Sequence, residues 1–93
     1  MIINDPTFPK FKYGWFISDI NKRIRFGVVN PYYFSKGIIE VAPLIEYSCI
    51  NNIEKYIAEA NKPNCYFCYT KVNRKDFFAT KQQAQNALKT RTN

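Results

Sequence analysis

The stretch that decides the fold is CYFCYTKVNRKDFFATKQQAQNAL, which runs from residue 65 to residue 88. Its segments 65–71 and 77–79 are rich in aromatic residues and threonine, and the segment 72–76 between them is polar and basic. Such residues favour extended backbone on either side of a turn. The pattern therefore predicts a hairpin of two paired strands around a basic turn.

A helix is predicted directly after this hairpin. Thr80 with Gln83 three residues later forms a capping box, the pattern in which two side chains satisfy the first free N–H groups of a helix. Ala84, Ala87 and Leu88 follow at helical spacing. The helix is expected to lay this apolar side on the aromatic face of the hairpin.

A second hairpin is predicted near the N-terminus. Residues 11–18 form one strand, 19–22 a turn and 23–29 the returning strand. In the returning strand Arg23 and Arg25 alternate with apolar residues, the period-2 pattern of a sheet with one face in water.

The middle of the chain contains one ambiguous segment and one helical segment. Pro43 in residues 38–47 fits either an edge strand with a break or the first turn of a helix. Beyond it, apolar residues recur at helical spacing and predict a helix that ends before Pro63; these residues are Ile50, Ile53, Ile57 and Ala60. The sequence as a whole thus predicts an α+β fold, a small antiparallel sheet of two hairpins with two helices packed on one face.

Length and composition indicate one domain over residues 1–93. Aromatic residues make up 17% of the chain, enough for rings to build a core in a short protein. Two prolines predict an extended N-terminal arm over residues 1–10, and residues 89–93 are expected to form a basic tail.

The net charge of +7 is unevenly distributed. Residues 1–36 contain six basic and two acidic side chains, residues 37–60 one basic and four acidic, and residues 61–93 seven basic and one acidic. A basic face and an acidic face are expected, and a basic face favours nucleic acid or an acidic protein as partner. The alternative is that the excess charge only keeps the protein soluble.

No apolar run is long enough to span a membrane, and the N-terminus lacks a signal pattern, so we expect a cytoplasmic protein with no membrane partner. Three cysteines fit a reducing compartment. Cys65 and Cys68 have the spacing of a redox or metal pair, but a zinc site needs four ligands and only Cys49 could join them, since the chain has no histidine. We expect packed structural cysteines and no metal or cofactor, with the metal and redox readings as alternatives.

An enzymatic activity is not predicted. Without histidine the commonest general base is missing, and the three glycines lie too far apart for a phosphate-binding loop. The seven acidic residues are scattered along the chain. The sequence therefore favours a non-enzymatic binding protein.

Basic residues interleaved with aromatic ones provide the candidate binding surface. Lysine and arginine can neutralise phosphates, and exposed tyrosines can stack on unpaired bases. The alternative for the two arginines of the N-terminal hairpin is an ordinary solvated sheet face. The candidate residues are Lys22, Arg23, Arg25, Lys71, Arg74, Lys75, Lys81, Tyr32 and Tyr33.

A resemblance adds to this interpretation. Strand, basic turn and strand, followed by FATKQQA at residues 78–84, resembles the closing segment of the arm-type DNA-binding domains of phage integrases. That resemblance implies a small sheet set against DNA. In its size and its lack of catalytic groups the chain also resembles small accessory proteins of phages and mobile elements, including anti-CRISPR inhibitors. This likeness implies that it blocks a host protein–nucleic-acid complex by occupancy.

Two hypotheses follow from these observations. In the first, the basic surface binds nucleic acid or a host nucleoprotein complex, either at phosphates or in an acidic protein groove where nucleic acid would otherwise lie. In the second, the chain is a purely protein-directed inhibitor or an assembly subunit that uses its acidic segment 38–59 or the aromatic residues 32–34. Salt separates the two, because only phosphate binding weakens steeply as salt rises.

Overall fold

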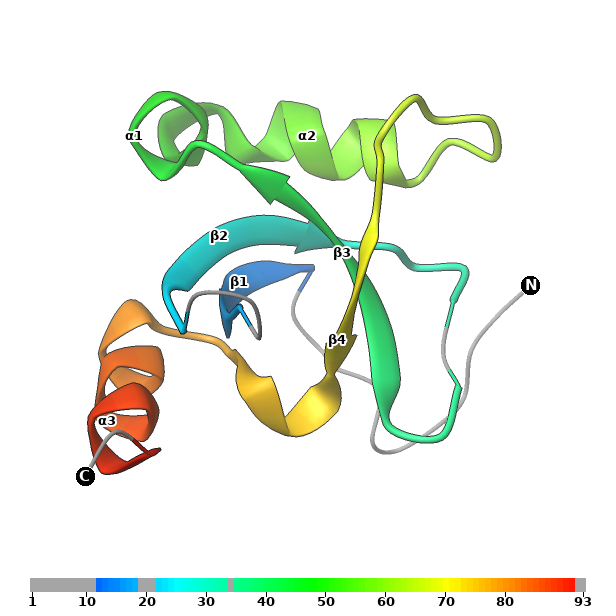
Figure 1. Ribbon diagram of the computed structural model, residues 1–93. Coiled ribbons are helices and arrows are strands. Elements are labelled where there is room, and N and C mark those ends of the chain that lie inside the picture. The colour runs from blue at the N-terminus through cyan, green and yellow to red at the C-terminus, as the bar shows by residue number, and fades with distance from the viewer. Residues whose placement is uncertain (1–11, 19–21, 34, 92–93) are drawn as a thin grey trace.

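Three strands that follow one another along the chain form the centre of the sheet in the computed structural model, which describes residues 12–18, 22–33 and 35–91 (Figure 1). Two further strands complete a five-stranded antiparallel sheet in the order β4-β3-β2-β1-β5. The α+β class is therefore confirmed. The elements are β1 (Tyr13–Ile17), β2 (Ile24–Val29), β3 (Ile38–Leu44), α1 (Glu46–Cys49), α2 (Ile53–Ala60), β4 (Thr70–Asn73), β5 (Phe77–Phe78) and α3 (Lys81–Arg91), with 3-10 turns at Ile50–Asn52 and Arg74–Asp76.

The predicted N-terminal hairpin is present as β1 and β2. Trp15 lies opposite Phe26, and Phe16 lies opposite Arg25. Arg25 is exposed, but Gly27 and Val29 on the same face of β2 are buried. This face of β2 is therefore exposed to solvent only near the turn. Most of the predicted turn, residues 19–21, lies outside the described residues, as does the predicted arm 1–10.

The predicted pairing of segment 65–71 with segment 77–79 is wrong. β4 pairs with β3, β5 pairs with β1, and the two strands lie on opposite edges of the sheet. Each edge already offered an unpaired row of backbone groups, so each short strand joins a longer partner. Residues 65–69 are not in a strand, because Phe67 there packs against helix α2.

The sheet is curled into a half-barrel, which follows from the link between its edges. Asn73 ends β4 and Phe77 begins β5, and the turn Arg74–Asp76 between them has three residues. Four residue steps reach at most about 14 Å, whereas the edges of a flat five-stranded sheet lie about 19 Å apart. The sheet must bend, and Figure 1 shows β4 crossing the direction of β1 and β2 steeply.

Two glycines allow this bend. Gly14 and Gly27 lie opposite each other on β1 and β2. A Cβ atom on Gly14 would come within 2.4 Å of the Phe78 carbonyl oxygen, and one on Gly27 within 2.4 Å of the Ala42 carbonyl oxygen. Glycine within a strand is typical of a tight bend where backbones approach closely.

The concave side of the curl holds one of two apolar cores. Every strand contributes to it, and Val72 of β4 and Phe77 of β5 belong to the same cluster although they come from opposite edges. Its members are Phe16, Val29, Ile39, Val41, Val72 and Phe77. We call the place where the two edge strands approach each other the seam. The contact between Val72 and Phe77 across this seam holds the short turn between β4 and β5 in place.

The helices cover the other side of the sheet, as predicted. Cys49 of α1 and Ala84 of α3 pack with Trp15 and Phe26, and Ala60 of α2 packs with Val28 and Ala42. Cys49 is buried, as expected for a structural cysteine. Cys65 is only half-buried and Cys68 is exposed, so the same expectation is wrong for Cys68.

Pro43 lies within β3, opposite Gly27 of β2. Of the two structures that the sequence allows around Pro43, the strand is therefore the one that forms. The Asn30 N–H donates to the Glu40 carbonyl oxygen, so even-numbered residues of β3 form the hydrogen-bonded pairs with β2. The nitrogen of Pro43 therefore points away from β2. On that side β4 pairs with β3 only as far as Val41, so the missing N–H costs no ladder bond.

The capping box at α3 is confirmed. The Gln83 N–H donates to Thr80 Oγ1 over 3.2 Å, and the Thr80 N–H donates to Gln83 Oε1 over 3.3 Å. The helix continues to Arg91, so residues 89–91 are helical and do not form the predicted basic tail.

We expect Thr80→Ala to lower the free energy of unfolding by about 1 kcal/mol, because the cap of α3 is lost. Urea denaturation measures this loss. Thr80→Ser keeps the hydroxyl acceptor and should retain most of the stability, so equal losses in the two variants would contradict the capping role.

Candidate nucleic-acid interface

The predicted basic residues fall into separate groups, and the first lies on the β1–β2 hairpin. Lys22, Arg23 and Arg25 are exposed there. The Ser18 N–H donates to the Arg23 carbonyl oxygen, and the Lys22 N–H donates to the Ser18 carbonyl oxygen, which closes the hairpin end. These cations thus lie at the end of the β1–β2 pairing.

The second group lies at the 3-10 turn between the two edge strands. Lys75 is exposed, and its N–H donates to Asn73 Oδ1 over 3.3 Å. Arg74 is half-buried, and its guanidinium donates to the Phe77 carbonyl oxygen over 3.3 Å. Arg74 therefore helps to hold the turn, whereas Lys75 projects from it.

The pairing of β3 with β4 adds Lys36 to this second group. The Arg74 N–H donates to the Gly37 carbonyl oxygen over 2.6 Å, so the exposed Lys36 lies beside the turn. Lys36 and Gly37 both have a positive φ, which marks the tight entry into β3. Sequence reasoning missed Lys36, although the glycine that follows it is a turn signal.

One residue of the first group, Arg25, is related to the end of the turn through the sheet register. Arg25 lies opposite Phe16, and Phe16 lies opposite Phe77, so Arg25 and Phe77 are two strands apart on the same face of the sheet. Two strand spacings amount to about 10 Å. We call Arg23, Arg25, Lys36, Arg74 and Lys75 the basic surface.

A hollow of about 510 Å³ opens next to the turn. Basic, amide and aromatic side chains line it, a combination that suits an anionic group with an attached ring or sugar. The lining residues are Arg74, Lys75, Phe77, Phe78, Ala79, Gln83 and Asn86.

Four cations of the basic surface, Arg23, Arg25, Lys36 and Lys75, form no ion pair with another described residue. The ion pairs between described residues are Lys62–Glu59, Lys81–Glu46 and Arg91–Asp76. Four of the five described carboxylates bond to other groups: Glu40 accepts from Asn30, Glu46 from Trp15, Glu59 from the Tyr66 N–H and Asp76 from Arg91.

Lys81 lies apart from the basic surface. Its Nζ is 3.5 Å from Glu46 Oε1, and the same oxygen accepts from the indole N–H of Trp15 over 2.9 Å. The Lys81 side chain thus connects α3 to α1 and β1, and its charge is partly neutralised.

Lys71 and Tyr33 form a further group beside β4. The Lys71 Nζ lies 5.7 Å from the centroid of the Tyr33 ring, a cation–π arrangement. Lys71 is opposite Glu40 on β3. Its side chain is therefore on the face of the sheet opposite to Val72 and the concave core.

Tyr32 lies near the C-terminal end of α2. Its hydroxyl donates to the Asn61 carbonyl oxygen, and its backbone N–H donates to Asn30 Oδ1. Its ring lines a second hollow, of about 380 Å³, which includes Phe67 and Tyr69. The structure thus places Tyr32 and Tyr33 away from the 3-10 turn.

Two further observations concern membrane-spanning helices and metal-binding groups. None of the helices that the structure describes is long and apolar enough to cross a membrane. Among the described residues, no three His, Cys, Asp or Glu side chains come together in a group able to hold a metal ion.

The segment behind the integrase resemblance does not form the paired hairpin on which that resemblance rests, since β4 and β5 occupy opposite edges. Helix α3 begins at Lys81, shortly after Phe78. In comparisons with known proteins, no protein-family model, no curated protein and no solved structure matches this chain.

Proposed function

We propose that the chain is a non-enzymatic binding protein whose basic surface holds the phosphate backbone of nucleic acid, either free or within a nucleoprotein complex. The observation that supports this most is that Lys36 and Lys75 are exposed beside one short turn, with the exposed Arg25 two strands from Phe77 at the end of that turn, and that none of these three cations has a carboxylate partner among the described residues. Each phosphate that such a cation neutralises releases condensed counterions, which drives binding.

The distribution of acidic groups supports the same proposal. Four of the five carboxylates in the described part of the chain are engaged in hydrogen bonds or ion pairs within the fold. Asp76 is the acidic residue nearest to Lys75 in the turn, and it is buried and paired with Arg91. The turn therefore presents positive charge outward.

A second candidate function rests on a different surface. Ile45 is 71% exposed and Tyr47 is 95% exposed at the start of α1, within the acidic segment of the chain. Exposed large apolar side chains are typical of protein–protein contacts. A protein-directed inhibitor or assembly subunit would use this surface instead of the basic one.

Charge reversal at Lys75 tests the proposal. We expect Lys75→Glu to weaken binding to a labelled oligonucleotide about tenfold or more, because one phosphate contact is lost and a repulsion is added. Electrophoretic mobility shift at low salt measures the change. Arg74 is left in place, because its bond to the Phe77 carbonyl oxygen makes its replacement a test of folding as well.

The matched control is Lys55→Glu, which changes the net charge equally on the exposed side of α2. We expect its affinity to stay within about threefold of the unmodified protein, since general charge effects are screened over a Debye length. Equal losses in both variants would contradict a localised phosphate site.

A further inference from the structure

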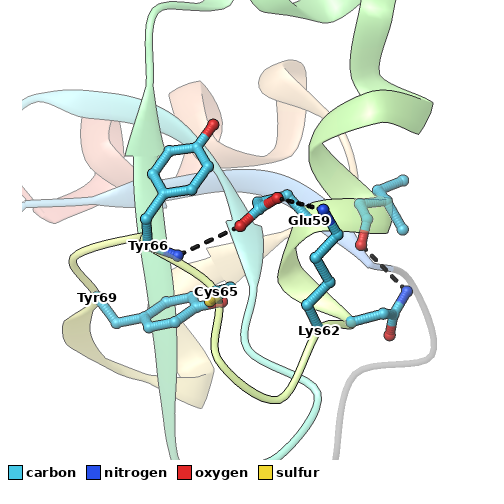
Figure 2. Close-up of polar contacts among 7 residues, drawn as sticks. Glu59, Lys62, Cys65, Tyr66 and Tyr69 are labelled. Atoms are coloured by element: carbon cyan, nitrogen blue, oxygen red, sulfur yellow. Dashed lines mark hydrogen bonds and ion pairs between the residues drawn. The ribbon is translucent and has the colours of Figure 1, made fainter.

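The loop between α2 and β4, residues 61–69, is held in place by several contacts (Figure 2). The Glu59 carboxylate contacts the loop at two points. Its Oε1 pairs with Lys62 Nζ over 3.1 Å, and its Oε2 accepts from the Tyr66 N–H over 3.3 Å. Cys65 Sγ lies 3.3 Å from the Tyr69 hydroxyl. The loop is therefore ordered before any ligand arrives.

Rings gather on the inner side of this loop. Phe67 stacks against Tyr56 of α2 at a centroid distance of 6.5 Å and meets Tyr69 edge-on at 6.2 Å. Tyr32 reaches the same place from the β2–β3 connection, and its bond to the Asn61 carbonyl oxygen fixes its ring. The orientation of these rings is thus set by the fold.

Tyr32, Phe67 and Tyr69 line the 380 Å³ hollow, whose size lies in the range of small-molecule sites. The other lining residues are Asn30, Lys62, Pro63 and Cys65. Burial, with the hydrogen bond to Cys65, raises the pKa of Tyr69, so its phenol is even harder to ionise than that of a free tyrosine. A hollow lined by three aromatic rings, with a few polar groups and the Lys62 ammonium, suits a flat heteroaromatic ring.

Strand β4 connects this hollow to the basic surface. Tyr69 directly precedes β4, Lys71 lies within it and Lys75 follows it. Tyr69 and Lys71 are alternate residues of an extended segment, so they lie on the same side. From Tyr69 to Lys75 the chain spans at most about 20 Å, a length that a few nucleotides cover.

We infer that the ligand is single-stranded nucleic acid: an unpaired base stacks in the hollow between Tyr32 and Tyr69, and the backbone follows β4 past Lys71 towards Lys75. A duplex could place a base there only by unpairing and unstacking it, which costs free energy that a single strand does not spend. This inference rests on the proposed function and adds the class of nucleic acid that the surface selects.

The test compares a labelled oligothymidine with a duplex of the same length by fluorescence anisotropy. We expect the single strand to bind about tenfold more tightly than the duplex, and Tyr32→Ala to remove about tenfold of affinity for the single strand while leaving the duplex unchanged. Tyr32→Phe keeps the ring but loses its bond to the Asn61 carbonyl oxygen, so it should lose clearly less affinity than Tyr32→Ala. Tyr47→Ala removes a more exposed ring, on α1, and should have no effect.

A second readout does not depend on any variant. A fluorescent adenine analogue within the single strand should be quenched on binding, because it stacks on a ring. Equal affinity for single strand and duplex, with no quenching and no effect of Tyr32→Ala, would overturn this inference and leave the proposed function standing. Failure of both nucleic acids to bind would contradict the proposed function itself.

Discussion

Gly27→Ala is expected to lower the free energy of unfolding by about 3 kcal/mol, the upper end of what overpacking usually costs. The new methyl group would lie 2.4 Å from the Ala42 carbonyl oxygen and 2.6 Å from Val41 Cγ1. The carbonyl belongs to the neighbouring strand and cannot move without disturbing the β2–β3 ladder. Urea denaturation followed by circular dichroism measures the loss.

Gly37→Ala is the control for this prediction. Gly37 has a φ of +80° and no atom near the place of a new Cβ, so alanine there adds backbone strain without crowding. Such strain costs about 1–2 kcal/mol. A smaller loss for Gly27→Ala than for Gly37→Ala would contradict the close approach of β2 and β3 at the bend.

Phe77→Ala is expected to cost about 3–5 kcal/mol, as large-to-small substitutions of buried rings do. Phe77 is fully buried in the concave core, where it contacts the cluster that joins β4 to β5. Its loss leaves a cavity at the seam of the half-barrel. The 3-10 turn with Lys75 depends on that seam, so we also expect weaker nucleic-acid binding.

The neighbouring Phe78→Ala provides the comparison. Phe78 is half-buried on the helix-covered side, at the margin of the other apolar cluster. It buries less area, so its loss should cost clearly less than that of Phe77. If Phe78→Ala destabilised the protein more, the concave cluster would not be the core that closes the sheet.

Local patterns in the sequence predicted the elements that depend on neighbouring residues. The capping box of Thr80 and Gln83 forms as expected, because both partners lie within one helical turn. The β1–β2 hairpin and the helix around Ile53 and Ile57 follow from short-range periodicity. In each case the information lies within a few residues of the element itself.

The pairing of the edge strands could not be predicted in this way. A basic turn between two aromatic segments fits a hairpin, but it equally fits a link between two edges of a curled sheet. The choice depends on whether Val72 and Phe77 meet inside a core to which three other strands contribute. That contact is non-local, so no pattern within residues 65–79 specifies it.

In the candidate site, too, local patterns identify the individual residues, and long-range contacts decide how they are arranged. The sequence offers Arg25 and Lys75 as separate exposed cations, and the sheet register places Arg25 two strands from Phe77, the residue that follows the turn of Lys75. Lys81 had the same local appearance, yet Glu46, far away in sequence, takes up its charge. Which cations remain unpaired is decided by long-range packing, which composition does not encode.

The dependence of oligonucleotide affinity on salt tests the central claim, phosphate binding by the basic surface, most directly. We predict a linear fall of log K with log salt, with a slope of about −0.7 for each phosphate contacted on a single strand. In Lys75→Glu the slope should be shallower by about 0.7, the contribution of one lost phosphate contact. An affinity that does not change with salt, or a slope that Lys75→Glu leaves unaltered, would contradict the account.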